Sequence, residues 1–142
     1  MSIRVAVNGF GRIGRLVFKA MQDETNIQVL AINDLTDIKT LAYLLKCDTV
    51  HNACPDSIRT DRQTLIARDR KVEICAGSDP SQSPWRELGV NFVIEAIGRF
   101  CSHEGLKLHL QAGARKIILT VPAKGDIDNT VVMGVNLGFR VV

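Results

Sequence analysis

The glycine-rich turn at residues 9–14 constrains the fold of this chain more than any other segment. Its sequence, Gly9-Phe10-Gly11-Arg12-Ile13-Gly14, is a G-x-G-x-x-G pattern. The apolar run over residues 3–7 that precedes it is typical of a buried strand, and the apolar side chains from Ile13 to Met21 recur at helical spacing. The sequence therefore predicts a strand, a glycine turn and a helix in direct succession.

The same alternation continues along the chain. Residues 28–32 predict a second buried strand that ends at Asn33-Asp34, and residues 38–45 predict a helix. Later segments predict a strand at 91–96, a helix at 102–112 with Ser102 as its N-cap, and a strand at 116–120. Alternating strands and helices imply parallel pairing with right-handed crossovers. We expect a doubly wound α/β sheet of the Rossmann type, as one domain over residues 1–142.

The remaining segments give weaker patterns. Polar, turn-rich sequence between Asp48 and Asp69 predicts loops and an excursion hairpin, with a β-like run at 64–67. Short strands are expected at 71–75 and, last in the chain, at 130–135. A loop over residues 78–84 leads into a helical turn at 85–88, where Trp85 is expected to anchor the loop on the core.

The glycine turn and Asp34 together suggest dinucleotide binding. Gly9 would allow the tight turn, Gly11 the approach of a pyrophosphate, and Gly14 close packing of the helix on the strand. The N-terminus of the helix offers unpaired N–H groups and a positive dipole end to phosphates. Asp34, 20 positions after Gly14, could accept hydrogen bonds from the adenosine ribose and repel a 2′-phosphate, which favours NAD over NADP. Two alternatives stay open: a glycine turn that binds nothing, and a capping role for Asp34.

Composition excludes several other classes of protein. No apolar stretch approaches the roughly 20 residues of a spanning helix, and no secretory signal opens the chain, so we expect a cytoplasmic protein without membrane contact. The 18 basic and 15 acidic residues give a net charge of +3 and are spread along the chain, which argues against a nucleic-acid partner. The four cysteines, Cys47, Cys54, Cys75 and Cys101, form no C-x-x-C pair, so neither a metal site nor a disulfide framework is expected.

Residues 5–15 resemble the opening of the phosphorylating glyceraldehyde-3-phosphate dehydrogenases, and the resemblance covers nearly the whole chain. The later segments that carry it are Ala31-Ile32-Asn33-Asp34, Leu44-Leu45-Lys46-Cys47-Asp48-Thr49-Val50-His51, Pro84-Trp85, Ala112-Gly113-Ala114-Arg115-Lys116 and Val132-Met133-Gly134-Val135-Asn136. Residues 85–90 are also similar to the sister family of erythrose-4-phosphate dehydrogenases. The resemblance implies Arg12 and Ile13 against the pyrophosphate, and Asn33 and Asp34 facing the adenosine. The NAD site it implies comprises Asn8, Gly9, Phe10, Gly11, Arg12, Ile13, Gly14, Asn33, Asp34, Ser78, Gly98, Phe100 and Thr120.

The sequence departs from the family pattern at several of these positions. Ser78 stands where the family usually has an arginine beside the adenine, so only backbone contacts are expected there. Ile97 replaces a hydroxyl residue near the cofactor, Cys101 stands where a threonine is common, and Thr120 replaces a usual serine. Cys101 is expected to line the cofactor groove rather than to act as a nucleophile.

The largest departure concerns the catalytic residues. The family's Ser-x-Cys-Thr-Thr-Asn segment, which supplies the thiolate, would follow the Gly-Val-Asn at residues 134–136, and it does not occur here. None of the four cysteines matches that nucleophile, and none of His51, His103 and His109 matches its base. His51 is expected in a loop, and His109 half-buried and hydrogen-bonded in a helix.

Two hypotheses follow. In the first, the chain is the NAD-binding half of a glyceraldehyde-3-phosphate dehydrogenase, and the resemblance implies a homotetrameric enzyme. As a variant of this hypothesis, the chain is the corresponding half of an erythrose-4-phosphate dehydrogenase. In the second, the chain is a stand-alone dinucleotide-binding module without catalysis. In either case we expect the isolated chain to be inactive. We also expect it to self-associate through apolar surface, with Val141 and Val142 at a ragged sheet edge.

Overall fold

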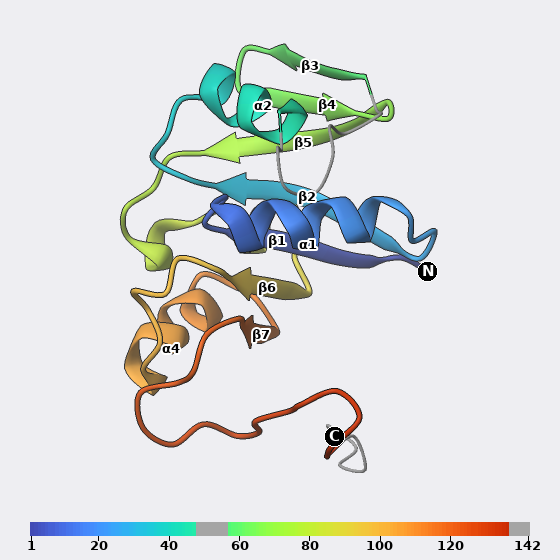
Figure 1. The fold of residues 1–142 in the computed structure, drawn as a ribbon. Coiled ribbons are helices and arrows are strands. Elements are labelled where there is room, and N and C mark those ends of the chain that lie inside the picture. The colour runs from blue at the N-terminus through green and yellow to red at the C-terminus, as the bar shows by residue number, and fades with distance from the viewer. Residues whose placement is uncertain (48–56, 137–142) are drawn as a thin grey trace.

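The structure, a computed structural model, describes residues 1–47 and 57–136 and shows an α/β fold (Figure 1). Some of the expectations concern residues outside these ranges. They are the loop position of His51, the thiol of Cys54 and the sheet edge at Val141 and Val142. The elements in chain order are β1 (Ile3–Asn8), α1 (Arg12–Gln22), β2 (Ile27–Asn33), α2 (Ile38–Lys46), β3 (Ile58–Asp61), β4 (Thr64–Ala67), β5 (Arg70–Cys75), the 3-10 helix η1 (Pro80–Gln82), α3 (Trp85–Leu88), β6 (Phe92–Glu95), α4 (His103–Gln111) and β7 (Lys116–Leu119).

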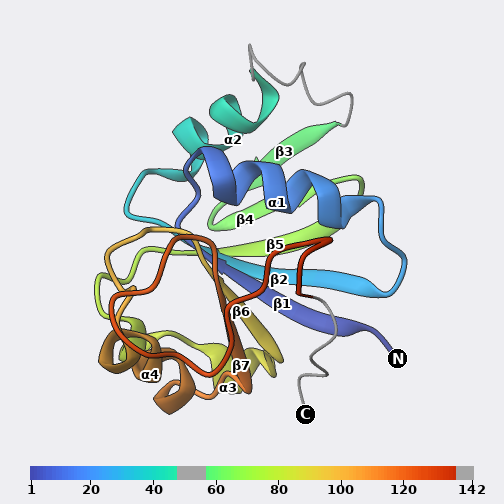
Figure 2. The same cartoon turned by 60° about the horizontal axis from the view of Figure 1, so that its bottom comes forward.

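The described strands form one sheet in the order β3-β4-β5-β2-β1-β6-β7. β1 pairs in parallel with β2 on one side and with β6 on the other, and β7 extends the sheet in parallel beyond β6. The expected doubly wound α/β fold is therefore confirmed. Helices cover both faces, with α1 and α2 on one face and α3 and α4 on the other (Figure 2).

Alternation along the strands divides the core into two layers. On β1, Val5 and Val7 belong to the layer that buries Phe18 of α1 and Leu41 of α2. Ala6, between them, points to the other face and belongs to the layer that contains Trp85. Side chains alternate between the two faces of a strand, so β1 is buried on both faces from Val5 onward, and its residues 5–7 are all apolar. The expectation that Trp85 anchors its loop on the core is confirmed, since its side chain is fully buried.

The parallel pairing expected from alternating strands and helices does not extend to one edge, where β3 and β4 form a hairpin within the stretch for which an excursion hairpin is expected. β4 runs antiparallel to both β3 and β5, so the sheet is mixed. The reason is the length of the connections, because two-residue turns can join only antiparallel strands. The turn between β4 and β5 contains Arg68 and Asp69, both with positive φ, as a tight hairpin of this kind requires.

The strand expected at Thr130–Val135 is also wrong. The chain there makes a turn in which the Val132 N–H donates to the Asn136 side-chain oxygen over 2.7 Å, and the Asn136 amide donates to the Thr130 carbonyl over 2.8 Å. Figure 1 shows this red segment as a loop outside the sheet. The apolar side chains that suggested a strand are exposed, and none of the described strands pairs with this part of the chain.

Candidate functional site

The carboxyl ends of three central strands meet at one edge of the sheet. In register, Asn8 at the end of β1 lies opposite Asn33 of β2 on one side and Glu95 of β6 on the other. The chain leaves β1 toward β2, and β6 lies on the opposite side, so the direction of the strand order reverses at β1. In open α/β sheets, ligands bind outside the carboxyl ends of the strands at such a reversal.

The glycine loop that follows β1 is tightly packed at its two ends and open in the middle. Gly9 has a φ of +94°, and a side chain there would meet the Ile97 backbone nitrogen at 2.8 Å. A methyl group at Gly14 would overlap the carbonyl oxygen of Gly9, so only glycine lets α1 pack this closely on the loop. Gly11 faces open space, with no atom within 4 Å of the position that a Cβ would take. The backbone is thus accessible at Gly11.

The N-terminus of α1 opens at this accessible point. Gly11 is the N-cap, no side chain caps the helix there, and its first turn holds no acidic residue. Arg12 and Ile13, the first residues of the helix, are exposed. Unpaired N–H groups and the positive end of the helix dipole suit an anionic group such as a pyrophosphate.

Phe10, in the middle of the loop, is held from three directions. Its N–H donates to Asp34 Oδ2 over 2.8 Å, and its carbonyl accepts from the Arg15 guanidinium over 3.0 Å. Its ring is buried and packs edge to face on Phe18, with ring centres 5.5 Å apart. The other oxygen of Asp34 accepts from the Thr36 N–H over 2.9 Å. Phe10 therefore offers backbone, not its ring, to the edge of the sheet, and Asp34 anchors the loop.

The next loop is tied to the first through Asn33. The Asn33 side chain donates to the Gly77 carbonyl over 2.9 Å, and its oxygen accepts from the Gly77 N–H over 2.8 Å. The backbone also joins the loops, since the Gly9 N–H donates to the Asn33 carbonyl over 2.8 Å. Ser78 follows Gly77 directly and is exposed at the same edge.

The predicted residues after β6 and β7 lie along the continuation of this edge. Gly98 turns the chain after β6 with a φ of +78°. The Thr120 hydroxyl, one residue beyond β7, donates to the Glu95 carbonyl over 3.1 Å. Phe100 lies farther out, half-buried beneath the Arg99 guanidinium, whose carbon is 5.7 Å from the ring centre. Thr120 is thus bonded to a central strand, whereas Phe100 lies against Arg99 of its own loop and close to Gly105 of α4.

Sequence reasoning named Asn8 and Asn33 but missed Glu95, the buried carboxylate to which these loops are joined. Glu95 is fully buried, and its Oε1 accepts from the Ile97 N–H over 2.8 Å. A usable signal was present in the sequence. Asn8, Asn33 and Glu95 each end a buried apolar strand, and buried polar groups need specific partners.

The described cysteines and His109 fit structural roles. Cys101 is buried, Cys75 half-buried and Cys47 exposed, all as free thiols. Burial, with a smaller contribution from the nearby Glu73 carboxylate, raises the pKa of the Cys75 thiol to about 11. His109 is hydrogen-bonded as expected, but it is fully buried rather than half-buried. In residues 1–47 and 57–136, no cluster of His, Cys, Asp and Glu could hold a metal ion.

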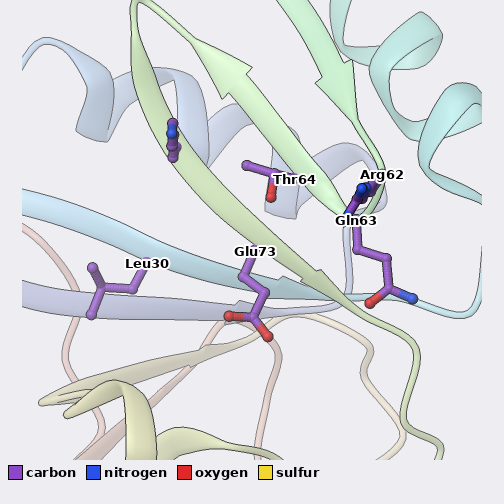
Figure 3. Close-up of a pocket in the computed structure, with 6 residues that line it drawn as sticks. Leu30, Arg62, Gln63, Thr64 and Glu73 are labelled. Carbon is purple, nitrogen blue, oxygen red and sulfur yellow. The ribbon is translucent and has the colours of Figure 1, made fainter.

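A hollow on the sheet surface lies apart from the glycine loop. It is lined by Leu30, Arg62, Gln63, Thr64, Lys71 and Glu73, most of them exposed side chains (Figure 3). None of the thirteen predicted site residues lines it. The hollow carries charges of both signs and has no counterpart to the open helix N-terminus at Gly11, so we do not assign it to the candidate site.

The parts described above fit a dinucleotide. The open backbone at Gly11 and the uncapped helix match a pyrophosphate, and the Asp34 carboxylate retains lone pairs for ribose hydroxyls. Fold and loop together define a Rossmann-type dinucleotide-binding domain. No helix within the described ranges has the length and apolar character needed to cross a membrane.

Comparison with known proteins makes the class specific. Residues 3–103 match the family described as "Glyceraldehyde 3-phosphate dehydrogenase, NAD binding domain", and the chain belongs to this family, whose cofactor is NAD. It is 53% identical to the glyceraldehyde-3-phosphate dehydrogenase of Thermotoga maritima over 135 residues, which cover 94% of this chain and 40% of that protein. Identity is 47% to the enzyme of Mycoplasma pneumoniae over 95% of this chain, and 45% to that of Geobacillus stearothermophilus over 96%. The chain spans about two fifths of the length of these relatives.

Proposed function

We propose that this chain is the NAD-binding half of a phosphorylating glyceraldehyde-3-phosphate dehydrogenase, with residues 1–142 as the cofactor domain. The observation that carries the proposal is the uncapped N-terminus of α1 at Gly11, next to the loop-anchoring carboxylate of Asp34. The named relatives are all dehydrogenases of this kind. The enzyme is expected to be cytoplasmic and to form 1,3-bisphosphoglycerate.

In this proposal the loops divide the cofactor between them. NAD, when bound, supplies a hydride acceptor. The N–H groups at Gly11, Arg12 and Ile13 hold the pyrophosphate, Asp34 accepts from the adenosine ribose, and Asn8 and Asn33 support the loops from below. Gly98, Phe100 and Thr120 line the remainder of the groove, and Ser78 contributes backbone near the adenine.

We further propose that the catalytic thiolate and its base come from a part of the enzyme outside this chain. Of the described thiols, Cys101 is buried and Cys75 has a raised pKa, which suits neither to nucleophilic attack at neutral pH. The exposed Cys47 is the C-cap of α2, where the negative end of the helix dipole disfavours a thiolate. The chain alone is therefore expected to bind NAD without oxidising an aldehyde.

The exposed apolar side chains after β7 suggest where that part, or a second copy of the chain, makes contact. Met133 and Val135 are 81% and 78% exposed, and Val131 and Val132 are about half exposed. Apolar surface of this kind marks contact surfaces. Light scattering across concentration should show self-association of the isolated chain, whereas a monomer at high concentration would contradict this part of the proposal.

Calorimetric titration with NAD, together with an assay of NADH formation, tests the main proposal. We expect the chain to bind NAD more tightly than NADP, and to form no NADH from glyceraldehyde-3-phosphate, phosphate and NAD. Absence of NAD binding would refute the proposed function. Robust turnover would instead refute the assignment of the thiolate to another part of the enzyme. An active full-length enzyme that prefers erythrose-4-phosphate would support the sister family.

A further inference from the structure

Five polar side chains form a continuous hydrogen-bonded chain through the interior, beneath the candidate cofactor loops. The Trp85 indole N–H donates to His109 Nδ1 over 3.1 Å, and His109 Nε2 lies 2.8 Å from Glu95 Oε2. Asn8 Nδ2 donates to the same Glu95 oxygen over 2.5 Å, and Asn33 Nδ2 donates to Asn8 Oδ1 over 2.7 Å. All five side chains are buried, and four of them are fully buried.

The direction of the bonds is fixed at the tryptophan end. An indole nitrogen can only donate a hydrogen bond, so Nδ1 of His109 must accept. A neutral imidazole carries a single proton, which this network assigns to Nε2. His109 therefore donates to Glu95.

The direction is equally fixed at the asparagine end. Gly77 holds both sides of the Asn33 amide through its own N–H and carbonyl, which leaves Nδ2 as the group that faces Asn8. Asn8 then accepts on Oδ1 and must donate from Nδ2 to Glu95. Hydrogen bonds from both ends of the chain thus run inward to one carboxyl group.

Glu95 is suited to this position because an ionised carboxylate only accepts. Its Oε2 takes the two bonds from His109 and Asn8, and its Oε1 takes the Ile97 N–H. A glutamine amide has the same shape, but its NH₂ group would face at least one of these donors. A buried donor without a partner is costly, and the cost spreads through a polar network.

Three loops of the candidate cofactor site begin next to a group in this network. Asn8 directly precedes Gly9, Asn33 directly precedes Asp34, and Ile97 directly precedes Gly98. The three loops come from three different strands, and through these bonds they share one buried acceptor. Glu95 itself has no exposed surface, so it acts on a ligand only through the loops.

We propose that Glu95 is a positioning residue for the cofactor. As the common acceptor of the hydrogen-bonded network, it holds the three loops in their binding geometry. Trp85 and Gly77 orient the hydrogen bonds of this network from its two ends. This inference rests on the proposed function, because it takes NAD as the ligand of those loops. Loops held in place before binding cost less to order when the ligand arrives.

Glu95→Gln tests the proposal in the full 142-residue chain, with Glu73→Gln as the matched control. Glu73 is likewise a strand carboxylate, but it is exposed and has no hydrogen bond to the five side chains of the network. At a temperature where circular dichroism shows both variants folded, we expect Glu95→Gln to weaken NAD binding about tenfold or more. The control should bind like the wild type. Equal NAD affinity in all three proteins would overturn the inference and leave the proposed function intact.

A second readout is independent of NAD binding and of overall stability. In ¹H–¹⁵N spectra, Glu95→Gln should shift the amide signals of Gly9, Asp34 and Gly98. Glu73→Gln should leave the signals of Gly9 and Gly98 in place; Asp34 is no control signal, because its N–H donates to the carbonyl of Cys75, close to Glu73. If the signals of Gly9, Asp34 and Gly98 are all unchanged in Glu95→Gln, the inference is overturned. If the wild type itself fails to bind NAD, the proposed function fails, and these spectra still decide whether Glu95 sets the loop geometry.

Trp85→Phe tests the same network from its far end, and it carries the test if Glu95→Gln does not fold. The change keeps an aromatic ring but removes the donor that fixes the tautomer of His109. NAD affinity should fall about threefold, although Trp85 belongs to none of the cofactor loops. Wild-type affinity in a folded Trp85→Phe protein would contradict the proposed role of the network.

Discussion

Charged side chains are buried at the centre of the sheet and exposed at its outer hairpin edge. At the centre, the Glu95 carboxylate is fully buried and accepts hydrogen bonds from Asn8, His109 and the Ile97 N–H. At the outer edge, Arg59 and Asp69 form an ion pair of 3.3 Å whose side chains are 65% and 88% exposed. Water screens the exposed pair, so it contributes little to stability, whereas the buried carboxylate is tolerated only because every donor around it is matched. Substitutions should therefore propagate at the centre and stay local at the edge.

The largest effect is expected at the tightest contact of the centre. Gly14→Ala adds a methyl group where the Gly9 carbonyl already lies. We expect the free energy of unfolding to fall by about 2 kcal/mol, even after the gain in helix propensity, and NAD binding to fall more than tenfold. Urea denaturation and calorimetry measure the two quantities.

Gly11→Ala is the matched control for this loop. A methyl group at Gly11 meets no atom within 4 Å, so the stability should stay close to that of the wild type. NAD affinity should nevertheless fall, because the methyl group would occupy the space proposed for the pyrophosphate. Wild-type NAD affinity in Gly11→Ala would contradict that placement.

The next largest effect is expected at Asp34. Asp34→Ala removes the acceptor for the Phe10 N–H together with the proposed ribose contact. NAD binding should weaken about tenfold, and the discrimination against NADP should relax, because the negative charge that repels a 2′-phosphate is lost. Affinities for both cofactors can be compared by calorimetry. If neither changes, Asp34 does not belong to the site.

A smaller effect is expected in the reactivity of the described thiols. With a pKa of about 11, Cys75 holds roughly one thiolate per thousand thiols at pH 8. Iodoacetamide labelling resolved by peptide mass spectrometry should therefore modify the exposed Cys47 well before Cys75. Glu73→Gln should speed the labelling of Cys75 slightly, because the Glu73 charge is the smaller cause of the raised pKa. Equal rates at the two cysteines would contradict this account.

The smallest effect is expected at an exposed carboxylate outside the centre. Hydrogen bonds from the Thr40 side chain and backbone lower the pKa of Asp37, the N-cap of α2, below its ordinary value of 3.8. The contribution of Asp37 to stability is present above pH 3.8 and is lost as the pH falls through the lowered pKa. Asp37→Asn should remove this small acid dependence, which thermal denaturation between pH 5 and about pH 2 would detect. An unchanged acid profile would show that the cap bond carries no net energy.

Much of the fold could be predicted because local patterns and tertiary structure agree. The first strand carries an apolar run because both of its faces are buried, and the helix after the glycine turn has one buried face. Ser102 caps α4 as expected by accepting from the Gly105 N–H over 3.2 Å. The apolar residues 131–135 misled the prediction, because periodicity cannot show whether a neighbouring strand exists. The antiparallel course of β4 depends on the positive φ values of Arg68 and Asp69 in the turn that follows it. The pair Arg-Asp is not one of the residue pairs, such as Asn-Gly, from which such a turn is predicted.

The candidate site was only partly predictable. The glycine loop and Asp34 follow a local spacing, so the sequence indicates them directly. The link from Glu95 to His109 and Trp85 joins residues that are up to 24 positions apart, and the link to Asn8 spans 87. Such contacts depend on which strands lie side by side, and no local pattern encodes that order.

Mapping the binding of NAD on the ¹⁵N-labelled chain tests the central claim most directly. The account predicts that NAD shifts the amide signals of Gly9, Gly11, Asp34, Gly98 and Thr120 at the centre of the sheet. The signals of β3 and β4, and of Arg62 and Glu73 at the hollow, should stay in place. Shifts confined to the hairpin edge, or no shifts at saturating NAD, would contradict the account.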